Sequence, residues 1–214
     1  MALGKGQCIV AYDKIIAIHS RLDNRINYAL NGEKTSDGEH ILQTALNCGI
    51  TSAYRDMQAT KNRWDKTGGI LGYHLIHSYS PGEISPERAH ELGIEFAQQL
   101  VGDRFEAVIG THTDHEHIHC HIIFNSVSFV DGGKFRSDYA AYYGGIRGLS
   151  NEISRKNGLS VIEPQGKGKH YAEWSAEKSG RPTIRGIIRQ DIDEAINRSF
   201  TVQSFYSLLE KQGY

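Results

Sequence analysis

Histidines are the residues in this sequence best able to do chemistry, and five of the 11 fall within residues 112–121. The segment reads HTDHEHIHCH and continues into IIFN. Its alternation of polar and apolar residues is typical of a β-strand, in which successive side chains point to opposite faces. His117, His119 and His121 therefore share one face of the predicted strand, and Cys120 lies on the other.

This spacing predicts a metal site. Two imidazoles two residues apart on a strand are about one metal-ligand span apart, and imidazole binds several divalent metals. His112 ends the preceding predicted strand and can close the site from across a hairpin. Three neutral ligands would leave positions open for a substrate oxygen, with Asp114 and Asn125 as candidates for orienting the rings. The alternative is a partly exposed polar strand face that binds no metal. Five histidines in ten residues make this alternative unfavourable. Structural zinc is disfavoured because Cys8 and Cys48 are far away in the sequence.

The elements that must position these histidines suggest an α+β protein. The expected core is a central antiparallel β-sheet with helices packed on one face, followed by a helical, basic C-terminal part. The clearest helix follows Ser85, a predicted N-cap, with Pro86 at its first position. Strands are expected at 6–18, 70–79, 105–114 and 117–130, the last two as a hairpin, and helices at 20–31, 39–47, 52–60, 86–101, from about 140, 186–198 and 201–212.

Composition narrows the class of protein. The length of 214 residues fits one large domain or two small ones. Three widely spaced cysteines predict no disulfide framework, and we expect a cytoplasmic protein because neither a signal peptide nor a membrane span is recognisable. The net charge of −1 conceals an acidic first part and a basic part after residue 133, which could follow a phosphate backbone. The chain ends just after a predicted helix, and we interpret residues 1–214 as one N-terminal domain of a longer protein.

Three segments together resemble a known family. The histidine segment is similar to the three-histidine motif of DNA relaxases, the mobilisation nucleases of conjugative plasmids and integrative elements in the HUH endonuclease superfamily. His119-Cys120-His121 would be the histidine–hydrophobic–histidine triplet. RINYALNGEKT resembles the segment with the nucleophilic tyrosine, and YHLIHSYSPGEISPERAHELG resembles the second relaxase motif. Because the motifs occur in order over almost the whole chain, the resemblance is to the MobA/VirD type, in its Gram-positive branch.

The resemblance implies a reaction and a set of roles. Relaxases nick one DNA strand at an origin of transfer, remain attached through a 5′-phosphotyrosine and later rejoin the strand. Tyr28 would be the nucleophile, and His112, His119 and His121 would bind Mg²⁺ or Mn²⁺. His112 could instead be the base that takes the tyrosine proton, and Asp114 would orient a histidine or assist proton removal.

Single-stranded origin DNA is the implied substrate, and relaxosome accessory proteins and a coupling protein are the implied partners. His19 is a rival nucleophile, since some relaxases of another branch use histidine. Whether His115 and His117 take part is open. The residues expected to contact DNA are Ser78, Lys134, Arg136, Arg147, Lys167 and Lys169, with Tyr139 and Trp174 as possible stacking platforms.

Three alternatives belong to other functional classes. A metal-dependent hydrolase of a substrate other than DNA would need a glutamate base near its ligands, a role open to Glu116. A DNA-binding module without chemistry has no need of three converging imidazoles. A rolling-circle replication initiator usually carries its tyrosine after the histidine motif, whereas Tyr28 precedes it.

Overall fold

The computed structural model describes residues 12–115, 117–138, 141–161, 175–176, 179–199, 201–211 and 213–214. The chain divides into two compact units, Met1–Ile162 and Glu163–Tyr214. The expected sites at Lys167, Lys169, Tyr139 and Trp174 lie outside the described residues.

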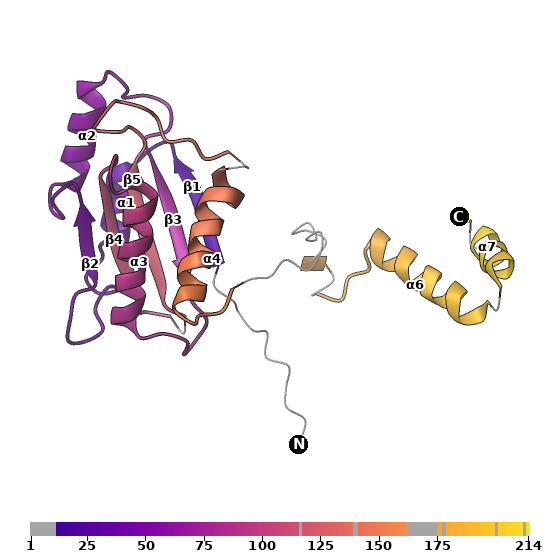
Figure 1. Cartoon of the computed structure of the whole chain (residues 1–214). Helices are drawn as coiled ribbons and strands as arrows, with labels where there is room; N and C mark the ends of the chain where they lie inside the picture. The colour runs from indigo at the N-terminus through magenta and orange to yellow at the C-terminus, as the bar shows by residue number, and fades with distance from the viewer. Residues whose placement is uncertain are drawn as a thin grey trace. The chain divides into compact units, whose positions relative to one another are not determined.

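The first unit is built on a five-stranded antiparallel sheet, which confirms the predicted α+β class (Figure 1). The strand order is β1-β3-β5-β4-β2. The strands are β1 (Tyr12–Ile18), β2 (Gln43–Leu46), β3 (Gly72–Ser78), β4 (Ala107–His112) and β5 (His119–Asn125). β4 and β5 form the predicted hairpin.

Helices cover both faces of this sheet, not one face as predicted. The central strands require this, because Val108 and Ile123 are apolar on one face while Ile109 and Ile122 are apolar on the other, and all four are buried. α1 (Leu22–Ala29) and α2 (Ala53–Arg63) pack over Val108 and Ile123. α3 (Pro86–Val101) and α4 (Arg147–Lys156), the latter preceded by the π-helix η1 (Ala141–Ile146), cover the opposite face (Figure 1).

The pairing register assigns each side chain to a face, since directly paired residues of a sheet point the same way. His119 pairs with His112 on one side and with Ser78 on the other. His121 pairs with Gly110 and Ile76. All of these residues lie on the α1–α2 face, at the end of the sheet where β5 begins.

Local sequence explains the start of α3 but not the strand β2. Ser85 Oγ accepts a hydrogen bond from the Arg88 backbone N–H, which confirms the predicted cap of α3. The predicted helix over 39–47 is wrong, because residues 43–46 form the short edge strand β2 against β4. Four residues of tertiary pairing here outweigh an apolar spacing that also fits a helix.

In the second unit, α6 (Ile184–Arg198) and α7 (Val202–Lys211) confirm the two helices predicted near the C-terminus. Thr183 caps α6 by accepting a hydrogen bond from the Gly186 N–H. Within the described part of the chain, none of the helices has both the length and the apolar content needed to cross a membrane.

Candidate metal centre and neighbouring tyrosine

The three predicted histidine ligands converge. Each of His112, His119 and His121 offers a ring nitrogen within 4.8 Å of those of the other two, and all three side chains are buried. His112 and His119 close the β4–β5 hairpin as a directly paired couple, and His121 follows on the same face. The ring centroids of His112 and His121 are 4.2 Å apart.

Hydrogen bonds occupy one ring nitrogen of His112 and one of His119, and the other nitrogen of each ring is available to a ligand at the centre of the cluster. His112 Nε2 lies 3.2 Å from the Ala29 carbonyl oxygen, and His119 Nδ1 lies 3.2 Å from the His117 carbonyl oxygen. These carbonyls can only accept, so the ring nitrogens facing them carry the protons. His112 Nδ1 and His121 Nε2 are buried without a hydrogen-bond partner among the described residues. Buried polar atoms of this kind call for a ligand, and a divalent cation fits the set.

A fourth histidine, His74 of β3, contacts the cluster from the same face of the sheet. His74 Nε2 lies 2.7 Å from His121 Nδ1, and His74 is itself buried. If His121 Nδ1 donates this hydrogen bond, His121 Nε2 keeps a lone pair for a metal, as expected for a ligating histidine. Sequence reasoning missed His74, although it shares the strand face of Ser78 at an even spacing.

Electrostatics keeps these rings neutral, which is the form that binds metal. Burial lowers the pKa of His112, His119 and His121, and that of His121 falls to about 2. Burial also lowers the pKa of His74 to about 4. The mutual proximity of the rings adds to these shifts, because one protonated ring would repel the next.

Helix α1 places Tyr28 over the cluster. Leu22, Ile26 and Ala29 form its buried side, and the Ala29 carbonyl lies so near the sheet that a Cβ on Gly110 would come within 1.8 Å of it. The Tyr28 ring centroid is 5.2 Å from those of both His112 and His121. Since Tyr28 remains 42% exposed, a substrate can reach it.

Lys34 and Asp114 border this tyrosine. Lys34 Nζ lies 2.8 Å from Asp114 Oδ2 and 5.3 Å from the centroid of the Tyr28 ring. The recorded partners of the Asp114 carboxylate are Lys34 and, at 3.7 Å, His115. Asp114 therefore contacts a histidine outside the three-histidine cluster, and its role in orienting a histidine or assisting proton removal stays a prediction.

The position of Ser78 fits its predicted role, whereas the position of Asn125 does not. Ser78 is half-buried beside His119, as a contact to DNA at the site would require. Asn125 lies at the other end of β5, where its amide nitrogen donates to Glu106 Oε2 and to the Met57 carbonyl. The prediction that Asn125 orients a ring of the three-histidine cluster is thus wrong, because five residues of extended strand separate it from His119.

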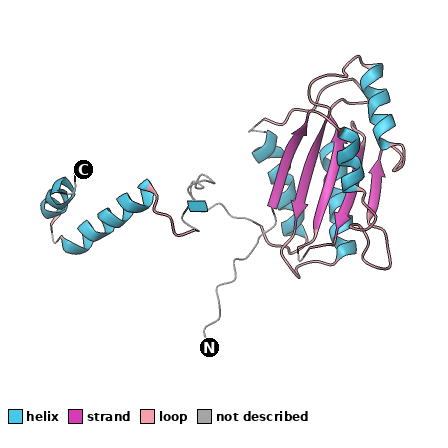
Figure 2. Cartoon of the chain, turned by 180° about the vertical axis from the view of Figure 1, so that it is seen from behind, coloured by secondary structure: helices cyan, strands magenta, loops and turns pink. Residues whose placement is uncertain are grey.

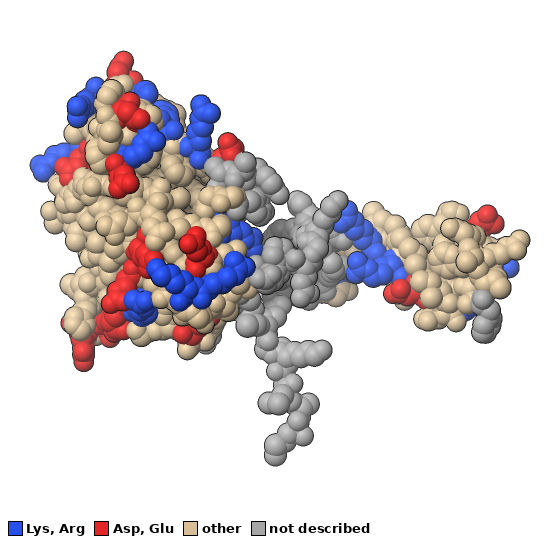
Figure 3. Space-filling model, viewed as in Figure 1, with Lys and Arg blue, Asp and Glu red and all other residues tan. Residues whose placement is uncertain are grey.

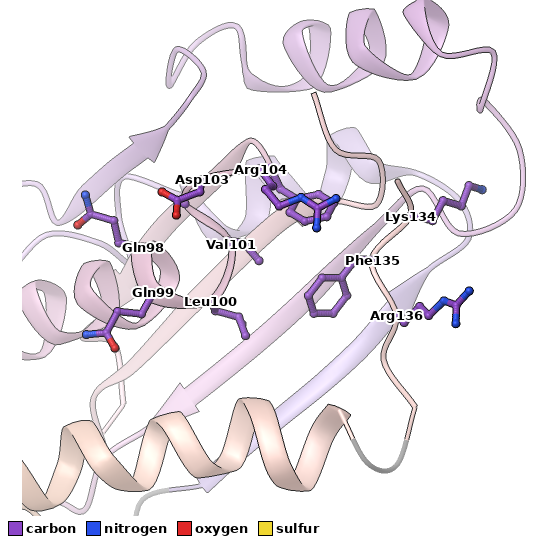
Figure 4. Close-up of a pocket in the computed structure, with 11 residues that line it drawn as sticks. Gln98, Gln99, Leu100, Val101, Asp103, Arg104, Lys134, Phe135 and Arg136 are labelled. Carbon is purple, nitrogen blue, oxygen red and sulfur yellow. The ribbon is translucent and has the colours of Figure 1, made fainter. Parts of the chain in front are cut away.

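Most of the predicted basic contacts lie away from the cluster. Lys134 bridges to Val127, eight residues along the chain from His119, or roughly 25 Å of extended strand. Lys134 and Arg136 line a cavity of about 390 Å³ beside Phe135 and Arg104 (Figure 4).

Arg147 begins α4, on the face opposite the histidines. In the described part of that face, basic and acidic side chains are mixed (Figure 3). Arg147 therefore lies on a surface that does not lead directly to the metal cluster.

Two rival assignments receive no geometric support. His19 follows Ile18, which pairs with Gly72 at the end of the sheet remote from His119. Residues 115–119 spell HExxH, but His119 opens a strand, so the helical geometry of the hydrolase motif is not formed. The rings of His115 and His117 stack near His119, at centroid distances of 5.7 and 5.3 Å.

Comparison with known proteins finds relatives both in sequence and in structure. The sequence model of one protein family, the MobA/VirD2-like relaxase nuclease domain, matches residues 28–159 of this chain. A protein rlx of Staphylococcus aureus is 34% identical over 176 residues, which cover 82% of this chain and 51% of the relative. The group II intron-interrupted relaxase LtrB of Lactococcus lactis subsp. cremoris (strain MG1363) is 30% identical over 156 residues, or 66% of this chain and 27% of the relative.

The chain thus spans about half the length, or less, of these two relatives. Among solved structures, the MobM relaxase domain bound to plasmid pMV158 oriT DNA aligns with a TM-score of 0.47 and 11% identity. This alignment covers 78% of this chain and 99% of that one.

Proposed function

The chain belongs to the MobA/VirD2-like relaxase nuclease family, and we propose that it nicks one strand of DNA at an origin of transfer. In this proposal Tyr28 attacks the scissile phosphodiester and His112, His119 and His121 hold Mg²⁺ or Mn²⁺. The observation that carries it is the exposed Tyr28 ring, 5.2 Å from two of the three converging imidazoles. A structural tyrosine would have no need of this position.

The chemistry balances without an external energy source. Tyr28 Oη forms a bond to phosphorus as the bond from phosphorus to the 3′-oxygen breaks. The phenol loses a proton and the departing 3′-oxygen gains one, which leaves a 5′-phosphotyrosine and a free 3′-hydroxyl. The bound cation would offset negative charge on the phosphate oxygens. Since one phosphodiester replaces another, the reverse reaction rejoins the strand.

Residues of this chain hold the reacting groups in place. The contact of the Ala29 carbonyl with Gly110 sets the height of α1 above the sheet, and the His112 N–H donates to that same carbonyl. The tyrosine helix and a metal ligand are therefore tied by one hydrogen bond. Such positioning reduces the loss of freedom that two reacting groups otherwise suffer in the transition state.

DNA has an open approach on the same face. Helix α1 packs over β4 and β5, while the edge strand β1 is not covered by a helix on that side (Figure 2). Lys14 and Ile16 of β1 and Arg25 of α1 are exposed there, and both cations act electrostatically on His74. A single DNA strand that crosses β1 and β3 would contact Ser78 beside the three-histidine cluster. Basic and apolar side chains together suit single-stranded DNA.

The remaining predicted contacts would act farther along the DNA. Lys134 and Arg136 are exposed at the opposite end of the sheet, so they would bind nucleotides remote from the nick. Arg147, Lys167 and Lys169 keep the same predicted role. We also propose that the reaction takes place in the cytoplasm, with relaxosome accessory proteins and a coupling protein as partners.

A covalent-adduct assay tests the proposal. The protein is incubated with a library of random single-stranded oligonucleotides, with Mn²⁺ or with EDTA, and attached DNA is recovered from a denaturing gel and sequenced. We expect an SDS-resistant adduct that needs Mn²⁺, is lost in Tyr28→Phe and is retained in His19→Ala. Tyr54→Phe is the matched control, since Tyr54 on α2 is also 42% exposed. An adduct that survives Tyr28→Phe or disappears in His19→Ala would refute the assignment of the nucleophile.

A further inference from the structure

One lysine beside the tyrosine has no part in the metal centre. Lys34 lies in the connection between α1 and β2, and its side chain is 29% exposed. Its ammonium group is within 2.8 Å of Asp114 Oδ2 and 5.3 Å from the centroid of the Tyr28 ring. It therefore places a positive charge beside the Tyr28 ring.

The backbone holds this lysine from two sides. Lys34 N–H donates to the Asn31 carbonyl just after α1, at 3.0 Å. The Lys34 carbonyl accepts from the Thr113 N–H just after β4, at 2.9 Å, and Thr113 Oγ1 donates to the Ser36 carbonyl at 2.7 Å. The segment that carries Lys34 is thus fastened both to the tyrosine helix and to the end of a ligand-bearing strand.

Stability alone does not explain the ion pair. Lys34 and Asp114 are each more than a quarter exposed, and pairs of this kind contribute little to folding. The Lys34 ammonium is charged at neutral pH, and its hydrogen bond to Asp114 raises the pKa of the lysine further. An ammonium has three N–H donors. One of them is directed to Asp114, and the other two can bind an incoming anion.

We propose that Lys34 binds a non-bridging oxygen of the scissile phosphate, and that Asp114 positions the Lys34 ammonium for that contact. The inference rests on the proposed nicking reaction. A phosphate in attacking range of Tyr28 is also within reach of a lysine beside the same ring. Lys34 would neutralise charge on the side of the phosphate that faces residues 31–36, and His112, His119 and His121 would hold the cation that acts from the sheet.

A charge-deletion cycle on the DNA tests the contact directly. The oligonucleotide recovered from the adduct assay is made in two forms, one with an ordinary phosphodiester at the nick and one with a neutral methylphosphonate there. Affinities are measured in EDTA in the Tyr28→Phe background, where no cleavage occurs. Lys34→Met should weaken binding of the phosphodiester about tenfold, the scale of one charge-assisted hydrogen bond, and binding of the methylphosphonate less than about twofold.

Controls separate this contact from general attraction between charges. Lys156→Met, on α4 at the opposite face, should leave the ratio of the two affinities unchanged. Lys34→Arg should retain most of the discrimination. Equal losses for both oligonucleotides in Lys34→Met would overturn the proposal, because they would show a contact elsewhere on the backbone.

Asp114 is tested through its dependence on Lys34. Asp114→Asn should reduce the discrimination between the two oligonucleotides when Lys34 is present and should have no further effect in Lys34→Met. Mn²⁺ affinity, measured by calorimetry, should not fall in Lys34→Met, since the lysine is outside the ligand set and its positive charge acts on His112 and His121. An additive effect of the two substitutions would contradict the positioning role.

The two proposals fail in distinguishable ways. If the unmodified protein forms no adduct with any oligonucleotide in Mn²⁺, the nicking reaction itself is refuted. If the adduct forms but Lys34→Met weakens binding of the phosphodiester and of the methylphosphonate equally, only the role of Lys34 is refuted. Thermal unfolding of each variant checks that it is folded.

Discussion

Replacing His74 with leucine should weaken Mn²⁺ binding while leaving the three ligands in place. His74 Nε2 is 2.7 Å from His121 Nδ1, and both side chains are buried. Without this acceptor the His121 ring can rotate, or carry its proton on Nε2 and direct an N–H at the metal position. Metal binding would then have to restore the productive orientation and tautomer. Loss of such a supporting hydrogen bond costs about 10–100-fold in metal affinity, or about 1.4–2.7 kcal/mol.

Isothermal titration calorimetry with Mn²⁺ at pH 7.5 measures this loss. His74→Gln offers a carbonyl acceptor and should keep its affinity within about threefold of the unmodified protein. His90→Leu is the matched control, because His90 is also buried but bonds Thr44 and Thr111 on the other face of the sheet. The reasoning is refuted if His74→Leu binds Mn²⁺ as well as the unmodified protein, or if His90→Leu loses as much affinity.

Further predictions concern packing and pH. Gly110→Ala should destabilise the protein by about 3 kcal/mol or more and abolish nicking, because its Cβ would meet the Ala29 carbonyl at 1.8 Å and displace α1. Gly145→Ala has open space around it and should change neither urea unfolding nor adduct formation. Without metal, the free energy of unfolding should fall between pH 7 and pH 5. Burial lowers the pKa of His74 to about 4, whereas in the unfolded chain it is about 6.5, so the unfolded state binds more protons as the pH falls through this window. His74 alone would account for a loss of about 2 kcal/mol at pH 5, and urea unfolding curves in EDTA that coincide at pH 7, 6 and 5 would contradict this.

The metal ligands could be predicted from sequence because a strand has a period of two. Once His119 and His121 are assigned to a strand, their common face follows, and a hairpin brings His112 opposite. The same rule applied to β3 would have found His74, which alternates with Ile76 and Ser78.

Other features depended on contacts that no local pattern contains. β2 has only four residues, and its apolar spacing fits a helix as well, so its pairing with β4 decides the outcome. The coverage of both sheet faces follows from the burial of β4 and β5, which the sequence does not show directly. Lys34 reaches the site from an irregular connection, and its partner Asp114 is 80 residues away in the chain.

The Asn125 prediction was wrong for a related reason. Sharing a face with a histidine says nothing about distance along the strand. Asn125 instead bonds Glu106 and the Met57 carbonyl, in a buried group that joins α2 to the sheet.

The β4–β5 hairpin also determines where this protein can accept insertions without losing the metal centre. Residues 113–118 link two strands whose register is already set by the ladder, so an insertion after Asp114 would leave His112 opposite His119 and would not interrupt the residues that contact Lys34. One residue inserted between Cys120 and His121 would instead turn the following side chains to the α3 face. An insertion in the connection after Asp114 would therefore change its length while the metal centre stays the same, whereas an insertion within either strand would disrupt the centre.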